Sequence, residues 1–195
     1  MIALPKPRKA SDVSLEFCLQ RRRSIREYRV RPLTLQQVSQ LLWAAQGITH
    51  ARGYRTAPSA GALYPMEIFL NAWEVEGLQA GLYWYSPARH ELEHRSEAVP
   101  RKDLARAALD QDAIRLAPAV FVIAAVYGRT TKKYGERGIR YVHMEAGHVA
   151  QNLCLQATAL NLGTVTIGAF YDNQVKRLLG LRDEDPLYLL PVGHP

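Results

Sequence analysis

The amino-acid sequence predicts a mixed fold of the α/β or α+β class, in which helices pack in layers on a sheet. Hydrophobic residues make up 48% of the 195 residues, which is enough apolar material for a folded core. Residues 119–126, AVFVIAAV, are nearly all apolar, as is typical of a strand that is buried on both faces. Helical and strand patterns follow one another without an internal repeat or a low-complexity linker, so we expect a single domain over residues 1–195.

Two helical patterns precede residue 50. Residues 15, 18 and 19 are apolar at helical spacing, and Ser11 and Asp12 are expected to cap this first helix. In the second pattern, Thr34 and Gln37 match a capping box that opens an apolar stripe, and Gly47 is expected to end the helix.

The remaining patterns supply the predicted sheet and three further helices. Strands are predicted at residues 68–73, 119–126, 164–167 and 187–192, and a hairpin joins residues 81–85 to residues 92–94. Helices are predicted at residues 102–109, from residue 140 to about residue 162, and from residue 172 to residue 179. The long helix carries small residues that permit close contact with another helix, including one from a second copy of the chain: Ala146, Gly147, Ala150, Ala157 and Ala159.

The net charge of +7 favours an anionic partner, which could be a nucleic acid, an anionic membrane surface or a phosphorylated ligand. Aromatic residues are only 9% of the chain and no nucleic-acid-binding motif appears, which disfavours the first of these. No apolar run reaches the roughly 18 residues of a transmembrane helix, and the first residues, MIALPKPRKA, lack the apolar core of a signal peptide. We therefore expect a cytoplasmic protein without a membrane partner.

Cysteine and histidine contribute little to the predicted chemistry. Cys18 and Cys154 are expected to be buried free thiols, so neither a disulfide nor a zinc site is predicted. His143 and His148 do not share a helix face, and the two histidines of the predicted hairpin are not expected to be ligands. We expect no metal site. Glu145, on the long helix, is expected to be a cap or an ion-pair partner rather than an acid catalyst.

The run RRRSIR at residues 21–26 has two interpretations. It could be a solvated helix end, where cations offset the helix dipole. It could also bind an anion, because Arg22 and Arg26 would lie one turn apart if the helix continued, and Ser24 adds a hydroxyl. The planar guanidinium group meets phosphate oxygens with two hydrogen bonds at once.

The segment RTAPSAGALYP at residues 55–65 is suited to neither a long helix nor a strand. Pro58 and Pro65 restrict its backbone, and the four residues SAGA between them have almost no side chain. Such a stretch lets the main chain approach a flat ligand closely, although a loop packed tightly on a helix would look the same. The segment GTVTIGAF at residues 163–170 also ends a strand without bulk, at Gly168 and Ala169.

Five segments occur in a fixed order along the chain: RRSIREY, APSAGALYP, EAGHVAQNL, LGTVTIGAF and PLYLLPVGHP. Their combination resembles the nitroreductase superfamily of flavin enzymes, and within it the SagB/ThcOx-type dehydrogenase branch, over about residues 14–195. The resemblance implies an α+β fold with a central, mainly antiparallel sheet flanked by helices. It also implies an intertwined, FMN-binding homodimer with two flavins at the subunit interface.

The resemblance assigns candidate cofactor-binding residues to three segments. The segment that holds the FMN phosphate and the polar edge of the flavin is matched by Arg22, Arg23, Ser24 and Arg26. The loop contributed by the partner subunit is matched by Pro58, Ser59, Ala60, Gly61 and Leu63. The segment that runs along the isoalloxazine ring is matched by Ile167, Gly168 and Ala169. Ala62 stands where many members have asparagine, so that contact is expected to be absent or made by backbone.

The resemblance also implies a reaction. An FMN-dependent oxidoreductase would transfer hydride through flavin N5 by a ping-pong mechanism, with NAD(P)H as the reductant and a nitroaromatic, a quinone or a similar small molecule as the substrate. The alternative is an azoline dehydrogenase, because Lys133 and Tyr134 match a Lys-Tyr pair of the branch that oxidises thiazolines and oxazolines. A lysine acts as a base only if its pKa falls from about 10.4, which burial or neighbouring cations would cause.

Three other interpretations remain open at this stage. The segment TTKKYGERGIRY around Lys133 could be a solvated basic loop without a catalytic role. The whole chain could be a basic nucleic-acid-binding module, which would bind with a steep inverse dependence on salt and carry no chromophore. It could also be a flavin-binding protein without turnover of its own.

Overall fold

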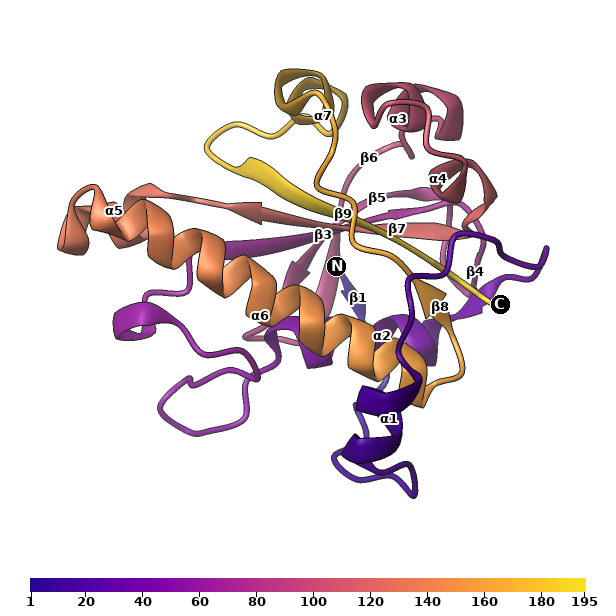
Figure 1. The fold of residues 1–195 in the computed structure, drawn as a ribbon, viewed down its shortest axis with the longest axis horizontal. Helices are drawn as coiled ribbons and strands as arrows, with labels where there is room; N and C mark the ends of the chain where they lie inside the picture. The colour runs from indigo at the N-terminus through magenta and orange to yellow at the C-terminus, as the bar shows by residue number, and fades with distance from the viewer.

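Helices cover both faces of one large sheet in the computed structural model, which describes all 195 residues (Figure 1). The helices are α1 (Leu15–Arg21), α2 (Leu35–Gln46), α3 (Arg101–Ala107), α4 (Asp112–Leu116), α5 (Gly128–Tyr134), α6 (Arg137–Ala159) and α7 (Asp172–Leu178). The strands are β1 (Ile2–Ala3), β2 (Leu33–Thr34), β3 (Met66–Ala72), β4 (Val75–Glu76), β5 (Gly81–Ser86), β6 (Glu91–Ser96), β7 (Ala119–Ala125), β8 (Gly163–Thr164) and β9 (Asp185–Gly193).

The main sheet has seven strands in the order β1-β6-β5-β3-β7-β9-β8, and every neighbouring pair is antiparallel. A separate short ladder pairs β2 with β4 in parallel. The register at the centre of the sheet runs from Met66 opposite Ala125 to Ala72 opposite Ala119. The predicted fold class is confirmed: the chain is an α+β protein with a mainly antiparallel sheet flanked by helices.

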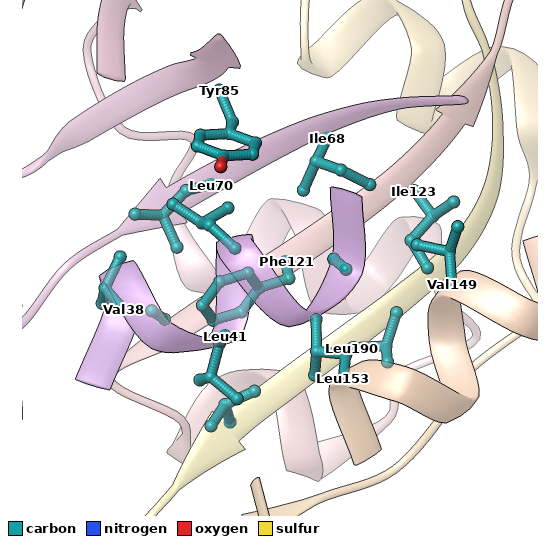
Figure 2. Close-up of a cluster of buried hydrophobic side chains, with 14 of the residues drawn as sticks. Val38, Leu41, Ile68, Leu70, Tyr85, Phe121, Ile123, Val149, Leu153 and Leu190 are labelled. Carbon is teal, nitrogen blue, oxygen red and sulfur yellow. The ribbon is translucent and has the colours of Figure 1, made fainter. Parts of the chain in front are cut away.

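Strand β7 lies between two hydrophobic cores, because its side chains alternate between the faces of the sheet. Phe121 and Ile123 belong to a core that the sheet shares with α2 and α6, whereas Val120 and Val122 belong to a core shared with α3, α4 and α7. Figure 2 shows the first core, in which Val38, Leu41, Val149 and Leu153 of the two helices face Ile68, Phe121 and Leu190 of the sheet. Burying one such large side chain contributes about 1.5–3 kcal/mol.

Several predicted elements are confirmed. The Thr34 hydroxyl accepts a hydrogen bond from the Gln37 backbone amide, and the Gln37 side chain accepts one from the Thr34 backbone amide. Gly47 caps the end of α2. The hairpin joins β5 to β6, and the apolar run at residues 119–125 is a fully buried strand. Both cysteines are buried free thiols.

The first helix differs from its prediction at both ends. Its cap is Ser14, whose side chain accepts a hydrogen bond from the Phe17 amide, rather than Ser11 or Asp12. The helix ends at Arg21, and Arg22 has extended backbone angles of φ −54° and ψ 128°. Arg22 and Arg26 therefore do not lie on one helical turn, and the arginine run continues as an extended segment.

Helices α4 and α5 were not predicted, and the long helix α6 begins three residues earlier than expected, at Arg137. The small residues of α6 mostly serve its own chain. Ala146, Ala150 and Ala157 are buried in the core shared with α2. Of the five small residues, only Gly147 is fully exposed and could contact a second copy of the chain. None of the helices combines the length and hydrophobicity that a membrane span requires.

Candidate active site

The small-residue loop, residues 58–63, is a tight turn built around Gly61. Residues 60–62 form one turn of 3-10 helix, in which Gly61 and Ala62 have left-handed φ angles of 64° and 53°. The Ser59 carbonyl accepts a hydrogen bond from the Ala62 amide at 3.0 Å. The Ser59 hydroxyl accepts another from the Tyr64 amide at 2.8 Å. Two bonds to one serine thus close the loop, and its small residues leave the backbone accessible.

Charged and aromatic groups hold the end of the loop at Tyr64. Arg129 of α5 donates to the Tyr64 carbonyl at 3.0 Å and forms an ion pair with Glu67 at 2.5 Å. The Trp84 indole donates to the other Glu67 oxygen at 2.6 Å. Arg55 stacks on the Tyr64 ring, with its guanidinium carbon 4.5 Å from the ring centroid. The loop is therefore attached to α5, to β3 and to β5.

Lys133 and Tyr134, at the end of α5, converge on Gly61. A β-carbon built on Gly61 would lie 2.8 Å from the Tyr134 hydroxyl and 3.0 Å from the Lys133 ammonium nitrogen. Tyr134 is half-buried and also packs edge-on against Tyr141, with ring centroids 5.2 Å apart. The two predicted catalytic residues and the predicted loop thus form one cluster. Lys133 itself is exposed, so the burial expected for a lysine base is absent in the single chain.

The arginine segment, residues 22–26, lies along the edge of the sheet, beside the last strand, β8. Ser24 forms a parallel bridge with Thr164 of β8, and the Ile25 amide donates to the Thr164 carbonyl at 3.0 Å. This approach requires a glycine at residue 163, because a β-carbon there would lie 2.7 Å from Ile25. Arg23, Ser24 and Arg26 are exposed and Arg22 is half-buried.

None of these three arginines takes part in an ion pair. Arg23 donates to the Gln20 and Arg22 carbonyls at the end of α1, at 2.9 and 2.7 Å, as the helix-end interpretation predicts. The side chains of Arg22 and Arg26 form neither an ion pair nor a hydrogen bond within the chain, so their positive charges are free to meet an anion.

Residues 167–169 follow β8 along the same edge of the sheet. Ile167 is buried and exchanges two backbone hydrogen bonds of 2.9 Å with Leu189 of β9. Gly168 and Ala169 are exposed. Strand β8 pairs with β9 on one side and with residue 24 on the other. The arginine segment and residues 167–169 are therefore both at the β8 edge of the sheet.

The predicted residues therefore fall into two groups. One group joins the arginine segment to residues 167–169, and the other joins the small-residue loop to Lys133 and Tyr134. Figure 1 shows that α1, which leads into the arginine segment, and α5, which carries Lys133, lie at opposite ends of the 23-residue helix α6. A single chain does not bring the two groups together.

Glu145 is a residue whose burial the sequence analysis did not predict. It lies within α6, is 2% exposed and forms neither a cap nor an ion pair, so the predicted role was wrong. Burial raises the pKa of its carboxyl group to about 7, and the Ser59 hydroxyl and Arg55 partly oppose that shift. The signal was its spacing: Glu145 lies three residues after Val142 and four before Val149, on the buried stripe of the helix.

The residues present fit a flat, phosphorylated cofactor such as FMN. Gly61 and Ala62 are exposed and have little or no side chain, so a planar ring can approach the backbone of the turn closely. The unpaired arginines of the other group suit a phosphate. No three His, Cys, Asp or Glu side chains are placed as metal ligands would be.

Comparison with known proteins defines the class of protein to which this fold and site belong. The family model described as the nitroreductase family matches residues 19–194. The chain therefore belongs to the nitroreductase family and is an oxidoreductase of that superfamily, as its sequence motifs predicted.

Individual relatives agree with this assignment. The chain is 52% identical to MJ1384 of Methanocaldococcus jannaschii, a protein assigned to the nitroreductases, over 93% of this chain and 91% of that protein. A crystal structure of a protein named as a nitroreductase, from Ralstonia eutropha, superposes with a TM-score of 0.86 at 31% identity, covering 99% of this chain and 88% of that one.

A second kind of relative is named for the processing of microcin B17. The chain is 32% identical to the microcin B17-processing protein McbC of Escherichia coli over 65% of its length and spans 48% of McbC. It also superposes on a chain of the E. coli microcin synthetase McbBCD complex, which was solved with truncated pro-MccB17 bound. The TM-score is 0.77 at 25% identity, and the superposition covers 100% of this chain and 77% of that chain. The chain spans 38% of another similar structure, a nitroreductase-named protein of Anabaena variabilis.

Proposed function

We propose that the protein is an FMN-dependent oxidoreductase that passes hydride between two substrates in turn. The observation that carries this proposal is the combination of three arginines that form no ion pair with an exposed turn of small residues at Gly61. When bound, the flavin would supply the chemistry of accepting and donating hydride. The chain itself would bind the cofactor, control access to it and set its electrostatic surroundings.

Each group of residues has a part in this binding. Arg22, Arg23 and Arg26 would neutralise and hold the phosphate, and Ser24 would add a hydroxyl hydrogen bond. The backbone of residues 58–63 and of residues 167–169 would contact the flat ring on its faces and edge. Because Gly61 has no side chain, Lys133 and Tyr134 can approach the turn closely, which would place both residues near the ring.

A homodimer would bring the two groups together. In the single chain they lie at different ends of α6, so a complete site needs the loop of one copy and the arginine segment of another. Helix α1 offers a surface for that contact, because Leu15, Phe17 and Leu19 are 60%, 47% and 54% exposed. Exposed apolar side chains of this density are typical of an interface.

We propose NAD(P)H as the reductant and a small organic molecule, such as a nitroaromatic compound or a quinone, as the oxidant. The reductant would leave before the oxidant enters the same place. The exposure of Gly61 and Ala62 supports such an exchange, because successive ligands can reach the turn from solvent.

An absorption spectrum of the purified protein tests the cofactor, followed by denaturation and identification of any released flavin. A flavin spectrum with FMN released supports the proposal. Turnover of NAD(P)H with a quinone then separates an enzyme from a flavin-binding protein that does not turn over. A colourless protein that fails to bind added FMN contradicts it, and salt-dependent binding to nucleic acid would then explain the basic charge.

A second candidate function is oxidation of thiazoline or oxazoline rings in a peptide. Two observations favour it: Lys133 and Tyr134 converge on Gly61, and the chain resembles McbC and the microcin synthetase chain. Lys133 would take a proton from the ring carbon while the neighbouring ring position loses hydride, which forms the new double bond. Tyr134 would orient the lysine. A peptide-bearing partner protein would then be needed.

Replacing Lys133 by alanine tests this role, with Lys132→Ala as the control because Lys132 is an equally exposed neighbour. We expect Lys133→Ala to abolish azoline oxidation while FMN stays bound, and Lys132→Ala to retain it. Unchanged azoline turnover in Lys133→Ala would remove the base role and leave the first proposal intact.

A further inference from the structure

Glu67 is a buried carboxylate on the central strand β3, and each of its two oxygens has a partner. The residue is 9% exposed and lies opposite Ala124 of β7. Its Oε1 forms an ion pair with Arg129 of α5 at 2.5 Å, and its Oε2 accepts a hydrogen bond from the Trp84 indole at 2.6 Å. A buried charge is costly unless it is paired, so the folded chain holds the Arg129 guanidinium group at this point of the sheet.

Arg129 uses a second nitrogen of the same guanidinium group to hold the end of the small-residue loop. Its Nη2 pairs with Glu67, and its Nη1 donates to the Tyr64 carbonyl at 3.0 Å. Because the guanidinium group is planar and rigid, these two bonds together fix the Tyr64 carbonyl relative to the sheet. A lysine ammonium group, which is a compact point charge, would pair with Glu67 without reproducing this fork.

The loop needs to be held here, because its backbone is strained where it ends. Ala62 and Tyr64 have left-handed φ angles of 53° and 47°, although neither is a glycine. Such conformations persist only where the surrounding structure holds them. Within the loop, the Tyr64 amide donates to the Ser59 hydroxyl. From outside, Arg55 stacks on the Tyr64 ring and Arg129 binds the Tyr64 carbonyl. Of these three contacts, only the one from Arg129 joins the strained backbone to another element.

Arg129 and Lys133 lie one helical turn apart on α5. Residues four apart in a helix project from the same face, so the face that binds the Tyr64 carbonyl also carries the lysine. The Lys133 ammonium nitrogen would lie 3.0 Å from a β-carbon on Gly61, at the centre of the loop. One short helix thus contacts the loop at its end and at its centre, and a shift of α5 would change both contacts together.

We propose that Arg129 is a positioning residue, which fixes the spacing between the small-residue loop and Lys133 by binding Tyr64 and Glu67 at once. The proposal rests on the function proposed above, because it takes the loop to receive FMN and Lys133 to face the bound ligand. Arg129 is assigned no contact with cofactor or substrate, and it acts through the Tyr64 carbonyl and through its own helix. Its ion pair with Glu67 is the anchor that keeps α5 at the sheet.

Hydrogen exchange of the full-length chain without added cofactor tests the positioning. The Ala62 and Tyr64 amides, which donate within the loop, report on the loop, and the Gly135 amide, which donates at the end of α5, reports on the helix. We expect Arg129→Ala to speed exchange of both the loop and the helix amides about fivefold to tenfold, as the loss of one hydrogen bond predicts. Arg129→Lys keeps the charge of the ion pair and should speed exchange in the loop alone.

The control is Arg137→Ala, which removes an exposed cation at the start of α6 that forms no ion pair. Its exchange should match the wild type in the loop and in α5. Loop exchange in Arg129→Ala and Arg129→Lys that matches Arg137→Ala would overturn the proposal, and Arg129→Lys serves alone if Arg129→Ala does not fold. Equal acceleration of the loop and of Gly135 in Arg129→Lys would also overturn it, because the effect would then be a general loss of stability.

FMN titration, followed by flavin fluorescence, tests whether the loop is held in the shape that receives the cofactor. We expect Arg129→Lys to weaken FMN binding about fivefold to tenfold, in parallel with its faster loop exchange, and Arg137→Ala to bind as the wild type does. Unchanged FMN affinity in Arg129→Lys, together with faster loop exchange, would contradict a role in cofactor binding. A wild-type protein that binds no FMN, but whose loop exchange responds to Arg129→Lys, would refute the proposed function and leave the positioning role supported.

Discussion

A half-buried histidine, His90, connects the N-terminal residues to the body of the protein. His90 Nε2 lies 2.8 Å from the Ser39 hydroxyl, and His90 Nδ1 lies 2.8 Å from the Tyr85 hydroxyl. Since Ser39 donates to the Pro5 carbonyl at 2.5 Å, its oxygen must accept from His90 Nε2. Nδ1 is then left to accept from Tyr85. All these groups are satisfied only by a neutral imidazole.

This network predicts a pH-dependent contribution to stability. Burial lowers the pKa of His90, so the folded chain disfavours its protonation. The contribution is present above the unfolded pKa of about 6.5 and is lost as the pH falls through the lower folded value. We expect the difference in thermal midpoint between wild type and His90→Asn to shrink from about pH 7.5 to about pH 5. Asparagine suits the left-handed φ of 52° at this residue.

Replacement of the exposed His148 by asparagine is the control, because it changes the same side-chain type outside any buried network. Its thermal midpoint should follow that of the wild type at every pH. If His90→Asn also followed the wild type with a constant difference, the network would not depend on a neutral imidazole.

Two glycines allow the effect of backbone strain on stability to be distinguished from an effect on cofactor binding at the proposed site. Gly61 and Gly77 both have left-handed φ angles, of 64° and 75°, but a β-carbon meets Lys133 and Tyr134 only at Gly61. We expect Gly61→Ala and Gly77→Ala to cost a similar amount of stability, about 1 kcal/mol, measured by denaturant unfolding. Only Gly61→Ala should weaken FMN binding. Equal binding by the two variants would contradict a ligand at this turn.

Sequence motifs could indicate single residues but not their distant neighbours. The small residues of the loop and the unpaired arginines were recognisable, because each motif is local. The contacts of Gly61 with Lys133 and of Ser39 with His90 join segments that are far apart in the chain. These contacts depend on strand order and helix packing, which cannot be predicted from local sequence patterns.

At the scale of elements, the start of helix α2 could be predicted from local sequence alone. Its capping box satisfies backbone amides that the helix itself leaves unpaired. We expect Thr34→Ala to lower the free energy of unfolding by about 1 kcal/mol, measured by denaturant titration, and Thr34→Ser to restore most of that loss. Equal stability of the alanine and serine variants would show that the cap contributes little here.

Helix α5 illustrates the opposite case. Its sequence, GRTTKKY, has one aromatic residue, two β-branched residues and no apolar stripe, so its pattern does not predict a helix. Contacts with α6 and the bond from Arg129 to Tyr64 stabilise it instead. The two-residue strands β1, β2 and β4 were missed for a related reason, because a strand of that length has no periodicity to detect.

At the scale of the whole molecule, helix α1 presents apolar side chains to solvent. We expect Leu15→Glu to weaken the proposed homodimer and, with it, FMN binding. A glutamate in the first turn of the helix opposes the contact without disturbing the helix, because it suits the helix dipole. Sedimentation velocity would measure the mass, and fluorescence titration would measure binding.

The matched control is Leu116→Glu, on α4, where Leu116 is 50% exposed against 60% for Leu15. It adds the same charge on the opposite face of the sheet and should leave the mass unchanged. A Leu15→Glu protein that keeps both the mass and the FMN affinity of the wild type would show that α1 lies outside the interface.

The separation of the two groups of site residues along α6 has a genetic consequence. If each site takes its arginines from one copy and its loop from the other, two different inactive chains can repair one another. A mixed dimer of Arg26→Ala and Gly61→Ala chains would hold one doubly defective site and one intact site. Random pairing of equal amounts would then restore about a quarter of the sites. Two defective alleles expressed in one cell would complement each other, although neither supports activity alone.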